Sequence, residues 1–132
     1  MLLTFRPESL EKIRQGRKTT TIRRNPDRWV RWYFHPAREH DGRPLQIYEG
    51  SPRYGGRLIA LSACLNLYTT RGSDLRHQEA VADGFDDVLQ LIDRLSDLHG
   101  ILPLQVLVEE WAVIEFATRP ILVTFFEREG AA

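Results

Sequence analysis

The stretch GRKTTTIRR, residues 16–24, packs four basic side chains around three consecutive threonines. Gly16 is typical of a helix end, whereas the β-branched run that follows favours a strand, so the stretch predicts a helix-to-strand transition. The basic residues allow two interpretations. They form a charged turn that leads into an edge strand, or they surround a pocket for an anionic ligand in which a threonine reacts.

The elements on either side of this stretch follow from local pattern. LLTF, residues 2–5, predicts a short strand, and residues 7–16 predict a helix with Pro7 in its first turn and Gly16 at its end. Residues 19–23 predict the second strand. Residues 26–44 show no clean period and contain several breakers, so we interpret 25–44 as a long irregular excursion.

The remainder of the chain alternates between strands and helices. Strands are predicted at 45–50, 57–68, 105–116 and 121–127, and helices at 77–85 and 86–100. The apolar strand 57–68 is expected at the centre of its sheet, and Pro and Gly residues at 51–56 predict the turn before it. The order predicts an α+β fold: a small mixed β-barrel of five to seven strands with two or three flanking helices.

Length and composition indicate an ordinary globular chain. Its 132 residues, 42% hydrophobic and 27% charged, predict a single domain over residues 1–132. No apolar run approaches the roughly 18 residues of a membrane span, and the first residues do not resemble a signal peptide. The single cysteine, Cys64, allows no intrachain disulfide. We therefore expect a cytoplasmic protein with no membrane partner.

The net charge of zero conceals an asymmetry between the two halves. Residues 1–57 hold 13 Lys and Arg against 6 Asp and Glu, whereas residues 58–132 hold 5 against 12. Such asymmetry is a sign of nucleic-acid contact. The basic residues are nearly all arginine, whose planar fork suits phosphate and stacks on bases.

Neither a metal nor a cofactor is expected. His35 and His40 are five apart, His77 and His99 stand alone, and one cysteine makes no thiolate site. No glycine-rich phosphate loop is present. The segment RWVRWYF, residues 28–34, interleaves aromatics with arginine, which fits a base-stacking surface, a partner-binding surface or simple core packing under a loop.

Three blocks of the chain together resemble the ASCH domains of the PUA-like superfamily. IRQGRKTTTIR resembles the glycine, lysine, threonine and arginine signature at a strand start, EAVADGF (79–85) resembles the second block, and WAVIEF (111–116) resembles the closing strand. The resemblance covers about residues 2–116 and leaves 117–132 as an extra strand and tail. It implies a small barrel with a cleft between barrel and helices, and an association with RNA.

The resemblance also implies two enzymatic alternatives to a binding domain. Some small members resemble amidohydrolases that remove acyl groups from cytidine with a lysine, a threonine three positions on, and a distant glutamate. Lys18 and Thr21 fall on the first two positions, and Asp83 falls on the third with a shorter side chain. Another member is associated with cleavage of single-stranded RNA, so a ribonuclease is the other alternative.

The chemistry of these residues sets conditions on any reaction. A protonated lysine cannot accept the threonine proton, and burial and nearby cations would lower the Lys18 pKa while Asp83 would raise it. Positions 18 and 21 of a regular strand face opposite ways, so both line one pocket only if Lys18 belongs to the turn. The expected binding residues are the neighbouring arginines, with RNA or a nucleotide as the ligand: Arg17, Arg23, Arg24, Arg28 and Arg31.

Overall fold

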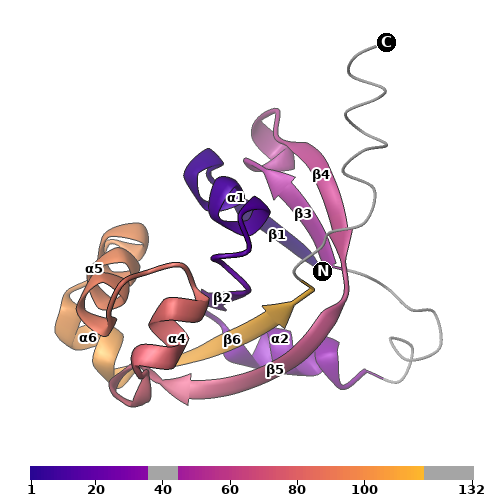
Figure 1. Cartoon of the computed structure of the whole chain (residues 1–132). Helices are drawn as coiled ribbons and strands as arrows, with labels where there is room; N and C mark the ends of the chain where they lie inside the picture. Colours follow the sequence, from indigo (N-terminus) through magenta and orange to yellow (C-terminus); the bar gives the residue numbers. More distant parts are fainter. Residues whose placement is uncertain (36–44, 118–132) are drawn as a thin grey trace, which may run out of the picture.

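Two small sheets make the framework of the protein (Figure 1). The structure, a computed structural model, describes residues 1–35 and 45–117. The first sheet has the strand order β1 (Leu2–Phe5), β3 (Leu45–Glu49) and β4 (Arg57–Ser62). The second has the order β2 (Thr20–Arg23), β6 (Glu110–Phe116) and β5 (Cys64–Arg71). The α+β class is confirmed, but the described residues form two separate three-stranded sheets and not the closed barrel predicted.

Both sheets are small, and one of them mixes strand directions. In the first sheet β1 runs parallel to β3, and β3 runs antiparallel to β4. In the second sheet β6 pairs antiparallel with β2 on one side and with β5 on the other. The central strand β6 therefore joins the N-terminal strand β2 to the rest of that sheet.

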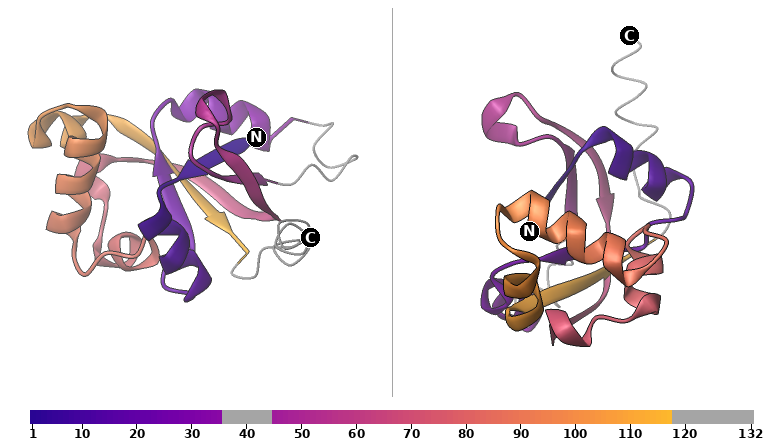
Figure 2. Two further views of the ribbon diagram at one scale, coloured as in Figure 1. Left: turned by 90° about the horizontal axis from the view of Figure 1, so that it is seen from above. Right: turned by 90° about the vertical axis from the view of Figure 1, so that its left-hand side faces the viewer.

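Five α-helices belong to the described residues, more than the two or three predicted. They are α1 (Pro7–Arg14), α2 (Pro26–Tyr33), α4 (His77–Ala82), α5 (Val88–His99) and α6 (Pro103–Val108). In Figures 1 and 2, α4, α5 and α6 gather at one end of the molecule, and the first sheet lies at the other end. No helix within the described ranges has the length and apolar character needed to cross a membrane.

Strand β6 separates two hydrophobic cores. Its residues Ala112, Ile114 and Phe116 face a core shared with β1, β3, α1 and α2. Trp111 and Val113 face the other way, toward a core made largely by α5 and its neighbours. A strand buried on both faces needs an almost continuous apolar sequence, which explains why WAVIEF alternates so little.

The predicted central strand 57–68 is in fact two edge strands. The chain leaves the first sheet after Ser62 and enters the second at Cys64, and β4 and β5 both lie at sheet edges. The change of sheet depends on tertiary pairing, so a continuous apolar run did not reveal it. The predicted strand 105–116 is also wrong in its first half, because Pro103–Val108 forms α6 before β6 begins.

The excursion 25–44 is regular in its first part, contrary to prediction. Pro26–Tyr33 forms α2, with Pro26 at the first helical turn where proline needs no backbone donor. Trp29 is buried, and Trp32 and Tyr33 pack against the same core, whereas Phe34 is exposed. The aromatics of 28–34 thus serve mainly as core rather than as a base-stacking or partner surface. Residues 36–44 and the predicted strand 121–127 lie outside the described residues.

Candidate functional site

The helix-to-strand transition at residues 16–24 brings Lys18 into the protein interior. Gly16 adopts a φ of +76°, so the chain reverses after α1 and the amides of Arg17 and Lys18 donate to the Lys12 carbonyl at 2.9 and 3.1 Å. Strand β2 begins only at Thr20. Lys18 therefore belongs to the turn, which is the condition under which it and Thr21 can face one pocket.

Lys18 meets Asp83 at the end of α4. The two residues form an isolated antiparallel backbone bridge, and the Thr19 amide donates to the Ala82 carbonyl at 2.7 Å. The Lys18 Nζ donates to Asp83 Oδ1, and it lies 3.4 Å from the Asp83 carbonyl oxygen. Both residues are buried, with 6% and 5% of their surface exposed. The two residues therefore form a buried ion pair that is flanked by backbone hydrogen bonds.

Glycine 84 allows this close approach. Its φ of +89° is rare for residues with a side chain, and an added Cβ would lie 2.9 Å from the Lys12 Cδ and 3.5 Å from the Lys18 Cβ. The segment after α4 therefore passes Lys12 and Lys18 at a distance that only glycine tolerates without displacement.

Thr21 and Arg23 share one face of β2 and complete the cluster. The Arg23 Nε donates to Thr21 Oγ1 at 3.1 Å, and a terminal nitrogen donates to the Thr4 carbonyl at 2.9 Å. The Phe5 ring lies within cation–π reach of both cations, 5.0 Å from the Arg23 Cζ and 5.6 Å from the Lys18 Nζ. These contacts fix the orientation of both cations.

The pKa values reflect the burial. Removal from water lowers the pKa of the Lys18 ammonium, and Arg23 and Lys12 lower it further, against the opposing effect of Asp83. Burial raises the pKa of the Asp83 carboxyl, against Lys18. Burial also lowers the pKa of Arg23 to about 10. The proton between Lys18 and Asp83 is therefore held less firmly by the lysine than in water.

A partly open pocket of about 90 Å³ lies beside this cluster. Its lining residues come from β1, α1, β2 and α5 and the turns beside them, and from Asp83 and Phe85 after α4. Its lining residues are Thr4, Phe5, Arg6, Ser9, Lys18, Thr21, Ile22, Arg23, Asp83, Phe85, Arg94, Leu95 and Leu98. Four predicted site residues, Lys18, Thr21, Arg23 and Asp83, thus surround one pocket.

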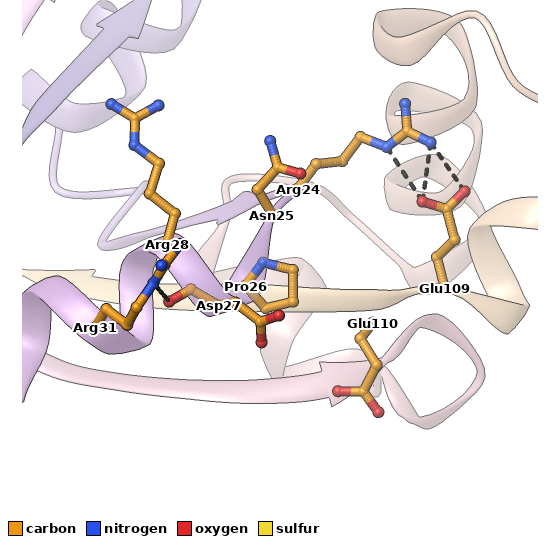
Figure 3. Close-up of a pocket in the computed structure, with 8 residues that line it drawn as sticks. All are labelled: Arg24, Asn25, Pro26, Asp27, Arg28, Arg31, Glu109 and Glu110. Carbon is orange, nitrogen blue, oxygen red and sulfur yellow. Dashed lines mark hydrogen bonds and ion pairs between the residues drawn. The ribbon is translucent and has the colours of Figure 1, made fainter.

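The other predicted arginines lie elsewhere. Arg24, Arg28 and Arg31 border a wider, open groove of about 720 Å³ beside α2, together with Asp27, Glu109 and Glu110 (Figure 3). Arg17 is exposed in the turn after α1 and borders neither of these two hollows. The five arginines therefore do not line a single surface hollow.

The groove is balanced in charge. Arg24 is held by Glu109 through contacts of 2.9, 3.0 and 3.2 Å, drawn as dashed lines in Figure 3. The hydrogen bond from Arg24 holds the pKa of Glu109 below its usual value. The Arg31 Nε lies 3.4 Å from the Asp27 carbonyl oxygen. A groove with three arginines and three carboxylates attracts a polyanion weakly.

Sequence inspection missed part of the pocket lining, notably Arg6 and Arg94. Arg6 directly follows β1, and Arg94 lies on α5 three residues after Leu91 and four before Leu98. A residue at that spacing lies on the apolar face of the helix. A charged side chain within this apolar stripe is the sequence feature that could have identified Arg94 as a pocket residue. No group of three His, Cys, Asp or Glu residues within the described ranges is placed to hold a metal ion.

Comparison with known proteins gives one structural likeness. No family model and no curated protein sequence matches the chain. The fold is similar to that of a crystal structure of a mutant ZmASCH protein from Zymomonas mobilis, with a TM-score of 0.52 over 99% of this chain and 79% of that one, at 18% sequence identity. At this identity the likeness concerns the fold. The resemblance found in the sequence is thus confirmed at that level, and the chain has the fold of an ASCH domain protein.

Proposed function

We propose that this protein binds RNA or a nucleotide in the pocket bordered by Lys18, Thr21, Arg23 and Asp83. The observation that carries the proposal is the excess of cations around a small pocket in which one carboxylate, Asp83, faces four basic side chains. Such an excess favours an anionic ligand. Exposed arginines outside the pocket, namely Arg17, Arg28 and Arg31, would contact the phosphate backbone, and Arg24 would do so only after leaving Glu109.

Titration of labelled single-stranded RNA at two salt concentrations tests this function. Phosphate contacts release counterions, so affinity should fall steeply between about 50 and 200 mM salt. A pocket variant, Thr21→Val, should weaken binding because it removes the hydroxyl that Arg23 holds. Arg53→Gln, an exposed change between β3 and β4, is the control. Salt-independent binding, or no binding at low salt, contradicts the proposal.

A second function, hydrolysis of an N-acylated cytidine or similar small amide, is favoured by the lowered pKa of Lys18 beside Thr21. The neutral Lys18 would take the proton of the Thr21 hydroxyl while its oxygen attacks the acyl carbon. The C–N bond then breaks, and the lysine returns the proton to the leaving nitrogen. Water, deprotonated in the same way, would release the acid from the threonine ester. Arg23 would stabilise the charged oxygen, and Asp83 would orient Lys18.

One contact in the structure defines what this reaction requires. The Lys18 Nζ donates to Asp83 rather than to Thr21, so the lysine must turn toward the hydroxyl when a substrate enters. Release of cytidine from its acyl derivative, followed by absorbance with chelator present, is the assay. Activity that survives both Thr21→Ala and Lys18→Ala contradicts the mechanism. The ribonuclease alternative gains no support, since no histidine among the described residues lines the pocket.

A further inference from the structure

Two arginines at the border of the pocket have no part in its internal contacts. Lys18 is bound to Asp83, and Arg23 is bound to Thr21 and to the Thr4 carbonyl. Arg6 and Arg94 also line the pocket, but within the described parts of the chain neither takes part in an ion pair or a side-chain hydrogen bond. Their donors are therefore available to a ligand.

The two arginines reach the pocket from separate parts of the fold. Arg6 lies between β1 and α1, and Arg94 lies in the middle of α5. Ser9, in the first turn of α1, adds a hydroxyl to the same lining. Arg6 is exposed and Arg94 is half-buried, in contrast with the buried Lys18 and Asp83. Both arginines are thus more accessible to solvent than the buried pair.

The size of the pocket indicates where a ligand's charge would lie. Its volume is about 90 Å³. That equals roughly three water molecules at about 30 Å³ each and falls well short of the roughly 300 Å³ at which pockets for drug-sized ligands begin. A nucleotide would place one part inside and leave the rest toward solvent, to which Arg6 and Arg94 are accessible. Arginine binds phosphate through paired donors, which a lysine cannot reproduce.

We propose that Arg6 and Arg94 bind a phosphate monoester, so that the pocket selects phosphorylated ligands over free nucleosides. The group is the phosphate of a nucleoside monophosphate or the phosphorylated end of an RNA strand. The inference rests on the proposed nucleotide-binding function, and it adds the determinant that separates a nucleotide from a nucleoside. Arg6 and Arg94 are specificity residues in this proposal and take no part in bond breaking.

Calorimetric titration of the four common ribonucleosides and their 5′-monophosphates tests the proposal. At least one monophosphate should bind about tenfold tighter than its nucleoside, a difference of about 1.4 kcal/mol. Arg6→Gln and Arg94→Gln should each remove most of that ratio, because they weaken binding of the monophosphate more than binding of the nucleoside. Arg6→Lys and Arg94→Lys, which keep the charge, should restore it only in part. Arg53→Gln is the matched control, and unchanged unfolding temperatures show that each variant folds.

Short oligoribonucleotides with and without a 5′-phosphate separate the two sources of the group. A phosphate preference that depends on both arginines identifies an RNA end if it is found with oligonucleotides, and a free nucleotide if it is found only with monomers. Equal affinity for nucleosides and monophosphates, or a ratio that survives both Gln variants, overturns the inference. RNA binding that ignores the terminal phosphate, together with monomers that show no phosphate preference, also overturns it and leaves the proposed function standing. Failure of every ligand to bind overturns the proposed function itself.

Discussion

Lys18 and Asp83 lie 65 positions apart in the chain, and they are joined by both a backbone bridge and a side-chain ion pair. The bridge connects the turn before β2 to the end of α4. The pair therefore ties the N-terminal region to the helical end of the molecule while bordering the pocket. The pair can therefore stabilise the fold and also take part in chemistry. The same burial that holds the two side chains in place lowers the pKa of Lys18 and raises the pKa of Asp83.

The stability losses from removing the two members of this pair should be strongly non-additive. Lys18→Met leaves a buried carboxylate without its partner, which costs about 3–5 kcal/mol in comparable pairs. The double variant Lys18→Met with Asp83→Asn should lose clearly less than the sum of the single changes. Urea unfolding measures each free energy. Arg14→Met, which breaks the exposed pair with Glu11, is the control and should cost at most about 0.5 kcal/mol. Additive losses would show that the two side chains are not coupled.

The free energy of unfolding should decrease as the pH falls, and His99 should account for part of the decrease. Burial lowers its pKa below the ordinary value of 6.5, and the nearby cations Arg24 and Arg23 lower it further, against Glu109. The unfolded chain therefore binds the proton more readily than the folded protein between the lowered pKa and 6.5, and stability is lost as pH falls through that window. His99→Phe, which keeps a ring against Trp111, should lose less stability between about pH 7 and pH 5. Thermal unfolding at several pH values shows the difference. Parallel curves for the two proteins would contradict it.

Gly84→Ala should destabilise the protein more than Gly55→Ala. Both positions have positive φ, +89° and +83°, so each variant bears a backbone cost of about 1–2 kcal/mol. At Gly84 the new Cβ also meets the Lys12 Cδ, whereas at Gly55 no heavy atom lies within 4 Å. The comparison therefore isolates the contact beside the ion pair. Equal unfolding free energies for the two variants would mean that Lys12 moves aside without cost.

Several elements could be predicted because their signals are local. Gly16 marked the end of α1, Asp87 caps α5 by accepting from the Gln90 amide, and Gly100 ends that helix in the left-handed conformation. Helix α2 was missed because the segment from Pro26 was interpreted as containing breakers, although proline is favoured in the first turn of a helix. Helix α6 was missed because residues 105–116 were predicted to form one strand. The apolar β-branched sequence after Pro103 added to the error.

Tertiary relationships account for the other differences. The exchange between sheets at Ala63 and the pairing of β2 with β6 bring together segments far apart in sequence, so local pattern does not reveal them. For the site, side-chain alternation set the turn position of Lys18 as the condition for a shared pocket, and the family resemblance grouped Lys18 with Asp83; the structure meets the condition and joins the two residues. The participation of Arg6 and Arg94 in the pocket lining depends on how α1 and α5 pack, which composition does not report.

Asp83→Glu should lower both stability and any amide-cleaving activity. Asp83 already reaches the Lys18 Nζ with its shorter side chain, and 5% of the residue is exposed. An added methylene in so enclosed a place typically costs about 1–3 kcal/mol and would displace the carboxylate from the lysine. Urea unfolding and the cytidine-release assay measure the two effects, with Asp93→Glu, an exposed change on α5, as control. Higher activity in Asp83→Glu would contradict this prediction. It would mean that the aspartate carboxylate lies too far from the reacting groups and that the longer side chain places it correctly.

The arginines of the groove should contribute unequally to RNA binding. Arg28 is exposed and has no ion pair among the described residues, whereas Arg24 is held by Glu109. If Arg28 contacts a phosphate, Arg28→Gln should reduce the slope of affinity against salt by about one contact. Arg24→Gln should change the slope less, because the contacts with Glu109 must first be broken. Glu109→Gln should increase RNA affinity, since it releases Arg24 and removes a negative charge from the groove. Unchanged affinity and slope in all three variants would assign the phosphate contacts to Arg17 and the pocket arginines, and would leave the groove outside the RNA-binding surface.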